Sequence, residues 1–393
     1  MSNFWDYSIW GGVNLIALLL MSLLAANMLK KTIPALQASL IPTSVLGGTM
    51  LLIVASVYSS LTGKQFFETN FFGGYGTEGL EIITYHALAL GFIATSFRSS
   101  SEKLTKKRSA EIFNTGVNTV IVYLLQGILG MAITILATKV VTGFFPAAGL
   151  LLPFGYGQGT GQALNYGSIY ETTYGFVGGK SFGLTVASMG FLAASIGGVF
   201  YLNVLKRQGK IRLDKGSGKM QEQVEGNNEI PMQESIDKFT IQIALIVVAY
   251  MLAYGLMYLL GSLLPGMRAT IYGFNFILGV LAATLVKTVL NFCQKRNIIH
   301  RNYTNDFLLT RATNFFYDIM VTASIAAIRM SIIGQYLGVL LIMGIVGLVV
   351  TYVYVHFVCR KLFPNYMEQQ FLAMYGMLTG TASTGVILLR EID

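Results

Sequence analysis

The sequence predicts an all-α integral membrane protein, an inverted five-plus-five helix repeat with two opposed re-entrant hairpins. Three observations predict it: little charge, apolar runs of membrane length, and two Gly-rich segments in matching places. Of the 393 residues, 54% are hydrophobic and only 11% are charged, against roughly 25% in a typical soluble domain. Soluble folds need polar faces on most elements, so this composition disfavours soluble enzymes and nucleic-acid-binding proteins.

The net charge of +9 also indicates a membrane protein. Lys and Arg residues gather in short loops beside apolar runs, which is typical of cytoplasmic loops. We therefore expect the lipid bilayer as a partner and no nucleic acid.

Nine segments are suited to cross a bilayer, which takes about 20 mostly apolar residues. One of them carries Asp318. The nine segments are 8–29, 43–62, 77–97, 113–138, 181–204, 239–261, 269–291, 308–328 and 332–358.

The charges predict an orientation for these spans. No Lys or Arg precedes the first span, while Lys30 and Lys31 follow it, so we expect an uncleaved anchor with its N-terminus outside. The protein would then be a multi-pass protein of the cell inner or plasma membrane. The segments placed on the cytoplasmic side hold 19 of the 27 Lys and Arg residues: 30–42, 98–112, 205–238, 292–307 and 359–368.

One of those segments divides the chain. It is polar, contains Gly and lacks apolar periodicity, so residues 206–238 are expected to form a flexible cytoplasmic linker. We predict an N-terminal transmembrane repeat over 1–205 and an inverted C-terminal repeat over 239–393.

The first Gly-rich segment reads FFPAAGLLLPFGYGQGTGQALNYGS and has four glycines within seven residues, 155–161. Each helical Gly costs about 1 kcal/mol relative to Ala, so this run should break a helix. Non-helical backbone at membrane depth is tolerated where it is buried in protein or lines a wet cavity. We expect a re-entrant hairpin over about 143–175. The alternative is a helix whose glycines form a close helix–helix contact.

The second such segment spans about 366–390, and its centre reads TGTASTG from Thr379. Each Gly-rich segment follows a long apolar span, and the predicted orientation makes them enter from opposite faces. Paired interrupted segments in inverted halves indicate a transporter's binding site near the bilayer midplane. The first half continues into a further span, 181–204, so a tenth helix is expected beyond Asp393.

At these two segments the sequence resembles the sodium/glutamate symporter family. PFGYGQGTGQAL (153–164) is similar to that family's first Gly-rich signature, and MYGMLTGTASTGVILLREID (374–393) to its second. The resemblance covers essentially the whole chain. It implies Na⁺-coupled secondary uptake of glutamate, ten helices, two opposed hairpins and a homodimer. Gln158 stands where a His is typical, and the second signature has less Gly and Pro than usual; both departures lie at the predicted substrate site.

Neutral oxygen atoms at the two Gly-rich centres can hold Na⁺, and helix N-termini that follow a break can hold a carboxylate. We therefore predict that glutamate, or a similar small anion, lies between the hairpin tips, with Na⁺ as the coupling ion and no catalytic residue. The predicted Na⁺ ligands are Thr160, Thr381, Ser383 and Asp318. The predicted substrate-binding residues are Gly157, Gln158, Gly159, Thr160, Gly161, Thr379, Gly380, Thr381, Ser383, Thr384 and Gly385.

Ionisable residues inside the spans have two interpretations each. Asp318 could bind Na⁺ or be a solvated or paired carboxylate. Arg98 and Arg329, at matching places in the two halves, could neutralise a substrate carboxylate or extend to the interface. His86 could face the substrate or be a hydrogen-bonded packing residue.

Two other functions stay open at this point. A symporter of the same architecture could carry another organic anion or amino acid. Phe154-Gly155-Tyr156-Gly157 is similar to the Gly-Tyr-Gly of potassium filters, which would suit an ion channel, but filters use symmetric copies of one loop.

Overall fold

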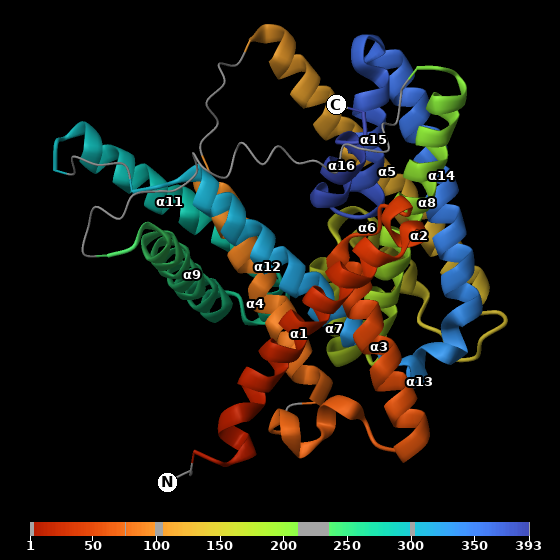
Figure 1. Cartoon of the computed structure of the whole chain (residues 1–393), viewed down its shortest axis with the longest axis vertical. Coiled ribbons are helices and arrows are strands. Elements are labelled where there is room, and N and C mark those ends of the chain that lie inside the picture. Colours follow the sequence, from red (N-terminus) through yellow and green to blue (C-terminus); the bar gives the residue numbers. More distant parts are fainter. Residues whose placement is uncertain (1–3, 75, 99–104, 211–235, 299–302, 393) are drawn as a thin grey trace. The chain divides into compact units, whose positions relative to one another are not determined.

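The structure is a computed structural model that describes residues 4–74, 76–98, 105–210, 236–298 and 303–392 (Figure 1). These residues are predominantly helical and include no strand, which confirms the all-α prediction. Most of the predicted linker, 206–238, falls on residues 211–235 and lies outside the described part of the chain.

Within the described ranges, eight helical segments are long and apolar enough to cross a membrane, which confirms a membrane-embedded protein. They are α1 (Tyr7–Thr32), α3 (Thr43–Thr62), η2 (Asn70–Phe72) with α4 (Gly76–Phe97), α5 (Lys106–Ala137), α8 (Gly179–Arg207), α9 (Lys238–Leu263), α11 (Asn275–Lys295), and α13 (Met330–Ile333) with η6 (Gly334–Tyr336) and α14 (Leu337–Leu362). Most of their ends lie within four residues of the predicted ones. The exceptions are three starts: the third span and α5 each begin seven residues earlier than predicted, and α11 begins six residues later.

The ninth predicted span, 308–328, forms α12 (Asp306–Ala326) but is not among these eight. Its length is sufficient, yet it carries Asp306, Arg311 and Asp318 along 21 residues. Short helices connect the long ones: α2 (Pro34–Ala38), η1 (Phe66–Glu68), η5 (Pro265–Met267), α10 (Arg268–Gly273) and η7 (Pro364–Tyr366).

The chain forms two compact units. The first unit comprises residues 1–85, 103–210 and 318–393, and the second comprises 86–102 and 211–317. In the second unit α9, α11 and parts of α4 and α12 pack around a core of Ile, Ala, Leu and Phe side chains, among them Ile93, Phe97 and Ile246.

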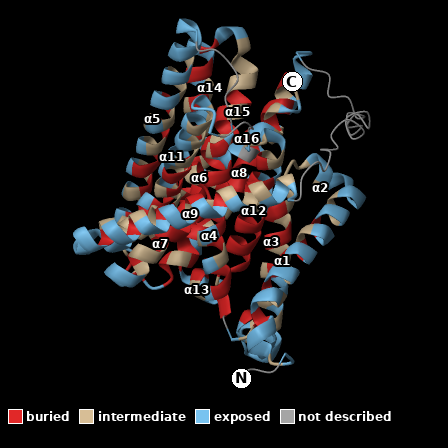
Figure 2. Cartoon of the chain, turned by 90° about the vertical axis from the view of Figure 1, so that its left-hand side faces the viewer, coloured by how far each residue is buried: buried red, intermediate tan, exposed pale blue. Residues whose placement is uncertain are grey.

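Helix α8 lies at the centre of the first unit. In its most apolar stretch of 18 residues, 67% of the residues are buried, against 28% in the corresponding stretch of α1. The red ribbon of α8 and the largely pale blue ribbon of α1 show this difference (Figure 2). Small residues on α8 permit close contacts: a Cβ on Gly197 would collide with the ring of Tyr375, and one on Gly198 with Leu388. The carbonyl of Ala193 accepts a hydrogen bond of 2.8 Å from the Tyr375 hydroxyl.

Helices α5 and α14 pack against each other in opposite directions. The Tyr354 hydroxyl donates to the Asn118 side-chain oxygen at 3.0 Å, and Gln126 Nε2 donates to the Thr351 hydroxyl at 2.9 Å. Residue numbers therefore rise on α5 while they fall on α14. The two helices that precede the Gly-rich segments are thus antiparallel.

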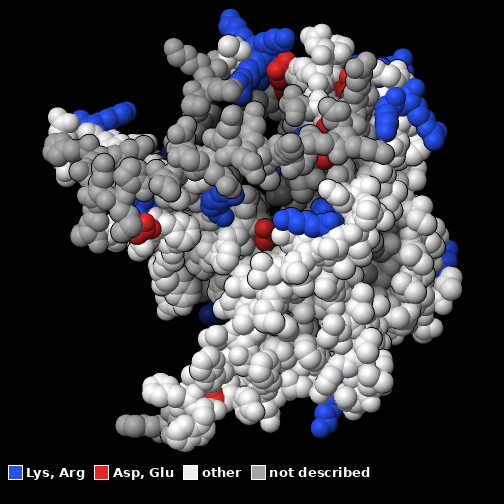
Figure 3. All heavy atoms as spheres, viewed as in Figure 1, with Lys and Arg blue, Asp and Glu red and all other residues white. Residues whose placement is uncertain are grey.

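The outward faces of the long helices are apolar. Met21, Leu24, Leu124 and Ile345 are each at least 60% exposed, and Figure 3 shows wide areas of surface without charged side chains. In water such faces would be unfavourable, so they are the surfaces that contact lipid.

Candidate functional site

The first Gly-rich segment folds into a helical hairpin. It comprises η3 (Pro146–Leu150), α6 (Leu151–Gln158) and α7 (Thr160–Tyr174). The chain reverses at Gly159, whose φ is +81°. The rings of Phe154 and Tyr166, one on each arm, stack with their centroids 3.7 Å apart. We call residues 146–174 the first hairpin.

The four glycines of this hairpin do not act alike. We expected them together to break the helix, but the break is at Gly159 alone, while Gly155 and Gly157 stay within α6 and Gly161 within α7. A Cβ on Gly155 would lie 2.8 Å from the α8 backbone, and one on Gly157 would collide with the Tyr123 ring. Tight helix packing therefore explains these two glycines and outweighs their low helix propensity.

The second Gly-rich segment also folds back on itself. It comprises α15 (Met367–Thr379) and α16 (Ala382–Leu389), with Gly380 and an extended Thr381 between them. The arms pack closely, because a Cβ on Gly376 would lie 2.7 Å from the Cα of Gly385. We call residues 367–389 the second hairpin.

The tips of the two hairpins touch. A Cβ on Gly159 would lie 3.0 Å from the Thr381 methyl group and 3.8 Å from the Gly380 carbonyl oxygen. Helices α7 and α16 begin directly after these residues, and neither N-cap residue provides a side-chain cap. Two helix N-termini with unsatisfied N–H groups thus meet at one place, which favours negative charge there.

Buried polar atoms without a partner lie close to the first tip. Thr160 is fully buried and its hydroxyl has no hydrogen-bond partner, and neither amide atom of the buried Gln162 has one. Both residues belong to the first turn of α7. An unsatisfied buried polar group costs about 1–3 kcal/mol, so these atoms are suited to hold a ligand or ordered water.

The hydroxyls of the second tip have partners of their own. The Thr379 hydroxyl donates to the Tyr375 carbonyl at 2.6 Å, and the hydroxyls of Thr381 and Thr384 lie 3.3 Å apart. The side chain of the predicted ligand Ser383 lies outside the described structure.

One residue that links α5 to α14 and to the second hairpin was not predicted from the sequence. Gln126 of α5 is 1% exposed, and its Nε2 donates to the Leu378 carbonyl at 3.0 Å as well as to Thr351. Its Oε1 has no partner. The available signal was a lone amide inside the apolar run VIVYLLQGILG.

Asp318 is not joined to the tips by any contact among the described residues. It lies on an exposed part of α12, and the Ser44 hydroxyl hydrogen-bonds its carboxylate. Of the four predicted Na⁺ ligands, Thr381 contacts Gly159, the residue before Thr160, while no described contact joins the Thr160 and Thr381 hydroxyls.

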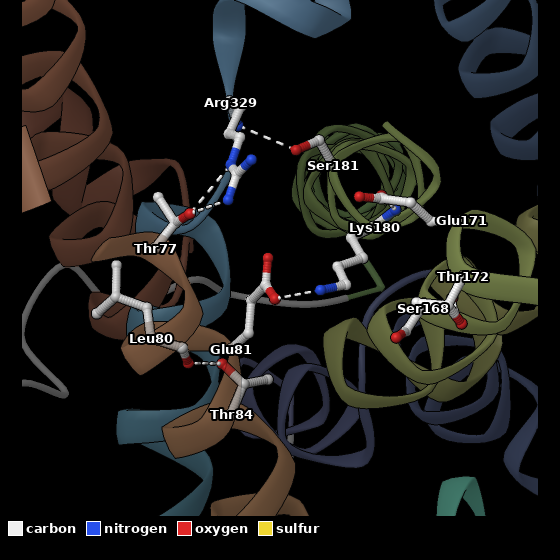
Figure 4. Close-up of polar contacts among 10 residues, drawn as sticks. All are labelled: Thr77, Leu80, Glu81, Thr84, Ser168, Glu171, Thr172, Lys180, Ser181 and Arg329. Carbon is white, nitrogen blue, oxygen red and sulfur yellow. Dashed lines mark hydrogen bonds and ion pairs between the residues drawn. The ribbon is translucent and has the colours of Figure 1, made fainter. Parts of the chain in front are cut away.

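A second polar cluster joins α4, α8 and the residues after α12 (Figure 4). Lys180 Nζ is 2.7 Å from Glu81 Oε2, and the Lys180 backbone N–H donates to Glu171 at 3.0 Å. Arg329 donates from Nε and Nη2 to the Thr77 hydroxyl at 3.0 and 2.6 Å.

This cluster has equal numbers of positive and negative side chains, and its hydrogen bonds tie helix ends together. The Arg329 backbone N–H also donates to the Ser181 hydroxyl, at 3.1 Å. The cluster therefore explains Arg329 as a structural residue at the end of α12. Sequence analysis did not predict the Glu81–Lys180 pair, because neither residue lies deep in an apolar run.

In the second unit His86 has the hydrogen-bonded packing position that was one of its two interpretations, whereas the described contact of Arg98 is a backbone one. His86 Nδ1 lies 2.7 Å from the Tyr250 hydroxyl, and the two rings meet edge to face. The Arg98 carbonyl accepts a hydrogen bond of 2.6 Å from Lys287 Nζ.

Comparison of this chain with protein-family models, with curated proteins and with solved structures finds no match. The site is therefore interpreted from its own geometry.

Proposed function

We propose that this protein is a secondary active transporter that takes up glutamate together with Na⁺. The substrate is held between the tips of the two hairpins, which are re-entrant and enter the membrane from opposite faces of an inverted repeat. The observation that carries the proposal is the set of unpartnered buried polar atoms of Thr160 and Gln162 beside two converging helix N-termini.

The tips are suited to an anion. The N-termini of α7 and α16 offer backbone N–H groups and the positive ends of two helix dipoles, which can hold a carboxylate without a buried Arg. The Gln162 amide can donate to a carboxylate oxygen and accept from an ammonium group. A small amino-dicarboxylate satisfies both kinds of contact.

Na⁺ would bind to neutral oxygens at the same place. Helices α6 and α15 end at the tips, so their last carbonyl groups have no intrahelical donor and favour a cation. Two of them, the Gly157 and Leu378 carbonyls, each already accept one hydrogen bond, from Tyr123 and Gln126. The Thr160 and Thr381 hydroxyls supply further oxygens, with Ser383 as an additional candidate. Asp318, which Ser44 hydrogen-bonds, is the weaker candidate.

Transport by alternating access follows from this arrangement. Two hairpins that enter from opposite faces can each uncover the site to one side. The proposal places the protein in the cell inner or plasma membrane, with its N-terminus outside, its linker in the cytoplasm and its chain in a homodimer.

One observation favours a related function. Residues 157–161 and 379–385 contain no Asp or Glu, so recognition of the carboxylate is stronger than recognition of an ammonium group. A symporter for another small organic anion is therefore the second candidate.

Proteoliposomes test the proposal. The protein should accumulate labelled glutamate only when an inward Na⁺ gradient is present, and competition with aspartate, citrate and neutral amino acids should identify the substrate class. Uptake that does not depend on Na⁺ would contradict symport. Competition by citrate but not by aspartate would favour the second candidate, and large single-channel currents would show a channel.

A further inference from the structure

A cavity of about 600 Å³ lies at the N-terminal end of α5, away from the hairpin tips. Residues of α5 form one wall, and Tyr366 and Gln370, where the second hairpin begins, form the other. Lys and Arg side chains gather at this end of the molecule in the view of Figure 3. The lining residues are Thr105, Lys107, Arg108, Glu111, Ile112, Thr115, Tyr366 and Gln370.

The acceptor groups of this cavity are already engaged within the protein. The Tyr366 hydroxyl donates to the Glu111 carboxylate, and Gln370 Nε2 donates to the Thr115 hydroxyl at 3.2 Å. The Thr105 hydroxyl accepts the Arg108 backbone N–H at 3.2 Å and so caps the helix. The basic side chains of Lys107 and Arg108 are exposed and give the lining a net charge of +1.

The position of the cavity along α5 is that of a membrane interface. The helix has 32 residues and is therefore about 48 Å long, well beyond the roughly 30 Å of hydrocarbon in a bilayer. Ile112 and Phe113, 55% and 69% exposed, begin an apolar outer face that Val120 and Leu124 continue. The basic end thus lies at headgroup depth, directly above a face that contacts acyl chains.

We propose that this cavity binds the phosphate headgroup of an anionic phospholipid, whose acyl chains follow the apolar face of α5. Basic pockets between transmembrane helices at the cytoplasmic side recognise such headgroups, and the charge of the lining, its depth and the adjoining apolar face together select a lipid. The bound lipid would join α5 to the start of α15 and so stabilise the base of the second hairpin. This inference does not depend on which substrate is transported.

Native mass spectrometry of the full chain in detergent tests the proposal. Dioleoyl-phosphatidylglycerol should bind at least about tenfold more tightly than dioleoyl-phosphatidylcholine. Lys107→Gln and Arg108→Gln should each weaken phosphatidylglycerol binding about fivefold, the effect expected for one basic residue at an anionic surface. Lys106→Gln removes the same charge from a neighbour that does not line the cavity; it is the matched control and should weaken binding clearly less than either lining variant, and an equal loss would show a general charge effect and overturn the site.

Two further measurements identify the source of the phosphate and the consequence of binding. Inorganic phosphate and glycerol 3-phosphate should compete only weakly with the lipid; competition as strong as that of phosphatidylglycerol would overturn the lipid assignment. Phosphatidylglycerol should raise the melting temperature of the wild type but not that of the Lys107→Gln/Arg108→Gln double variant. Equal binding of the two lipids, or unchanged binding by the double variant, would overturn the proposal whether or not the protein transports glutamate.

Discussion

Each of the two hairpins consists of two helices joined by a short reversal, but the polar groups at their tips differ in whether they have hydrogen-bond partners. The first reverses at one residue, Gly159, and leaves the polar atoms of Thr160 and Gln162 without partners. The second reverses over Gly380 and Thr381, and its described hydroxyls are engaged within its own chain. From this difference we propose that the first hairpin provides most of the ligand contacts and that the second closes over them.

The largest effect is expected where the first hairpin reverses. Gly159→Ala places a side chain at φ +81° and ψ −172°, a region essentially restricted to glycine, which costs about 1–3 kcal/mol, and it puts a Cβ 3.0 Å from the Thr381 methyl group. We expect Na⁺-dependent uptake to fall more than about tenfold. Uptake and thermal unfolding should be measured together.

Two glycine variants show whether this effect belongs to the first tip. Gly380→Ala should be milder, because the φ of Gly380 is −123° and the nearest atom is the movable Thr384 hydroxyl. Gly116→Ala, on α5 with no heavy atom within 4 Å, should transport normally. Equal losses at Gly159 and Gly380 would contradict the division of roles.

The second effect concerns how the second hairpin is anchored. Gln126→Leu removes the donor to the Leu378 carbonyl and to the Thr351 hydroxyl. A buried acceptor left unsatisfied costs about 1–3 kcal/mol, so the melting temperature should fall. Gln335→Leu, at an exposed position of η6, is the control and should leave stability nearly unchanged. If the Gln126 variant melts at the temperature of the wild type, the two hydrogen bonds of Gln126 do not stabilise the second hairpin.

The third effect compares the loss of a hydroxyl group from the first tip with the loss of one from the second. Thr160→Val should weaken the apparent affinity for substrate or Na⁺ about tenfold, the effect of one lost hydrogen bond. Its unfolding stability should stay the same or rise, since the hydroxyl has no partner in the protein. Thr384→Val should have a smaller effect, because that hydroxyl lies beside Thr381. If both variants transport like the wild type, the site is wrongly placed.

The smallest effect lies at the base of the second hairpin. Lys210 donates to Glu368 at 2.8 Å, and this hydrogen bond lowers the pKa of the Glu368 carboxyl. A carboxyl whose pKa is lower in the folded state stabilises the fold above its unfolded pKa of about 4.3, and this contribution is lost as the pH falls through the folded pKa.

Glu368→Gln tests this contribution. An exposed pair contributes less than about 1 kcal/mol, so the variant should be slightly less stable than the wild type at pH 7 and equal to it in acid. Melting curves at both pH values measure the difference. A difference that persists in acid would have another cause.

The membrane fold could be predicted from the sequence because it depends on composition and length. Long apolar runs placed most span ends within four residues of the helix ends, and Gly-rich segments located both reversals. The individual glycines could not be assigned, because Gly157 is required by the ring of Tyr123, 34 residues earlier in the chain.

The hydrogen-bond partners of buried polar residues could not be predicted from the sequence either. The Glu81–Lys180 pair joins residues 99 positions apart, and Gln126 reaches Leu378 across 252. Such pairs depend on which helices pack together, and no pattern along a single sequence predicts that packing. That Thr160 and Thr381 lie beside the reversals could be predicted, because the Gly residues next to them interrupt the helices; their role as ligands stays a prediction.

The contact between Gly159 and Thr381 has a consequence for the size of the cargo. With a glycine facing a methyl group, the tips leave little room between them, because a Cβ on Gly159 would already lie 3.0 Å from the Thr381 methyl group. In the transport that we propose, a solute between the tips has to push them apart, so its volume would set how far the hairpins separate. An analogue that is too large would be expected to hold them open and to inhibit transport without being carried.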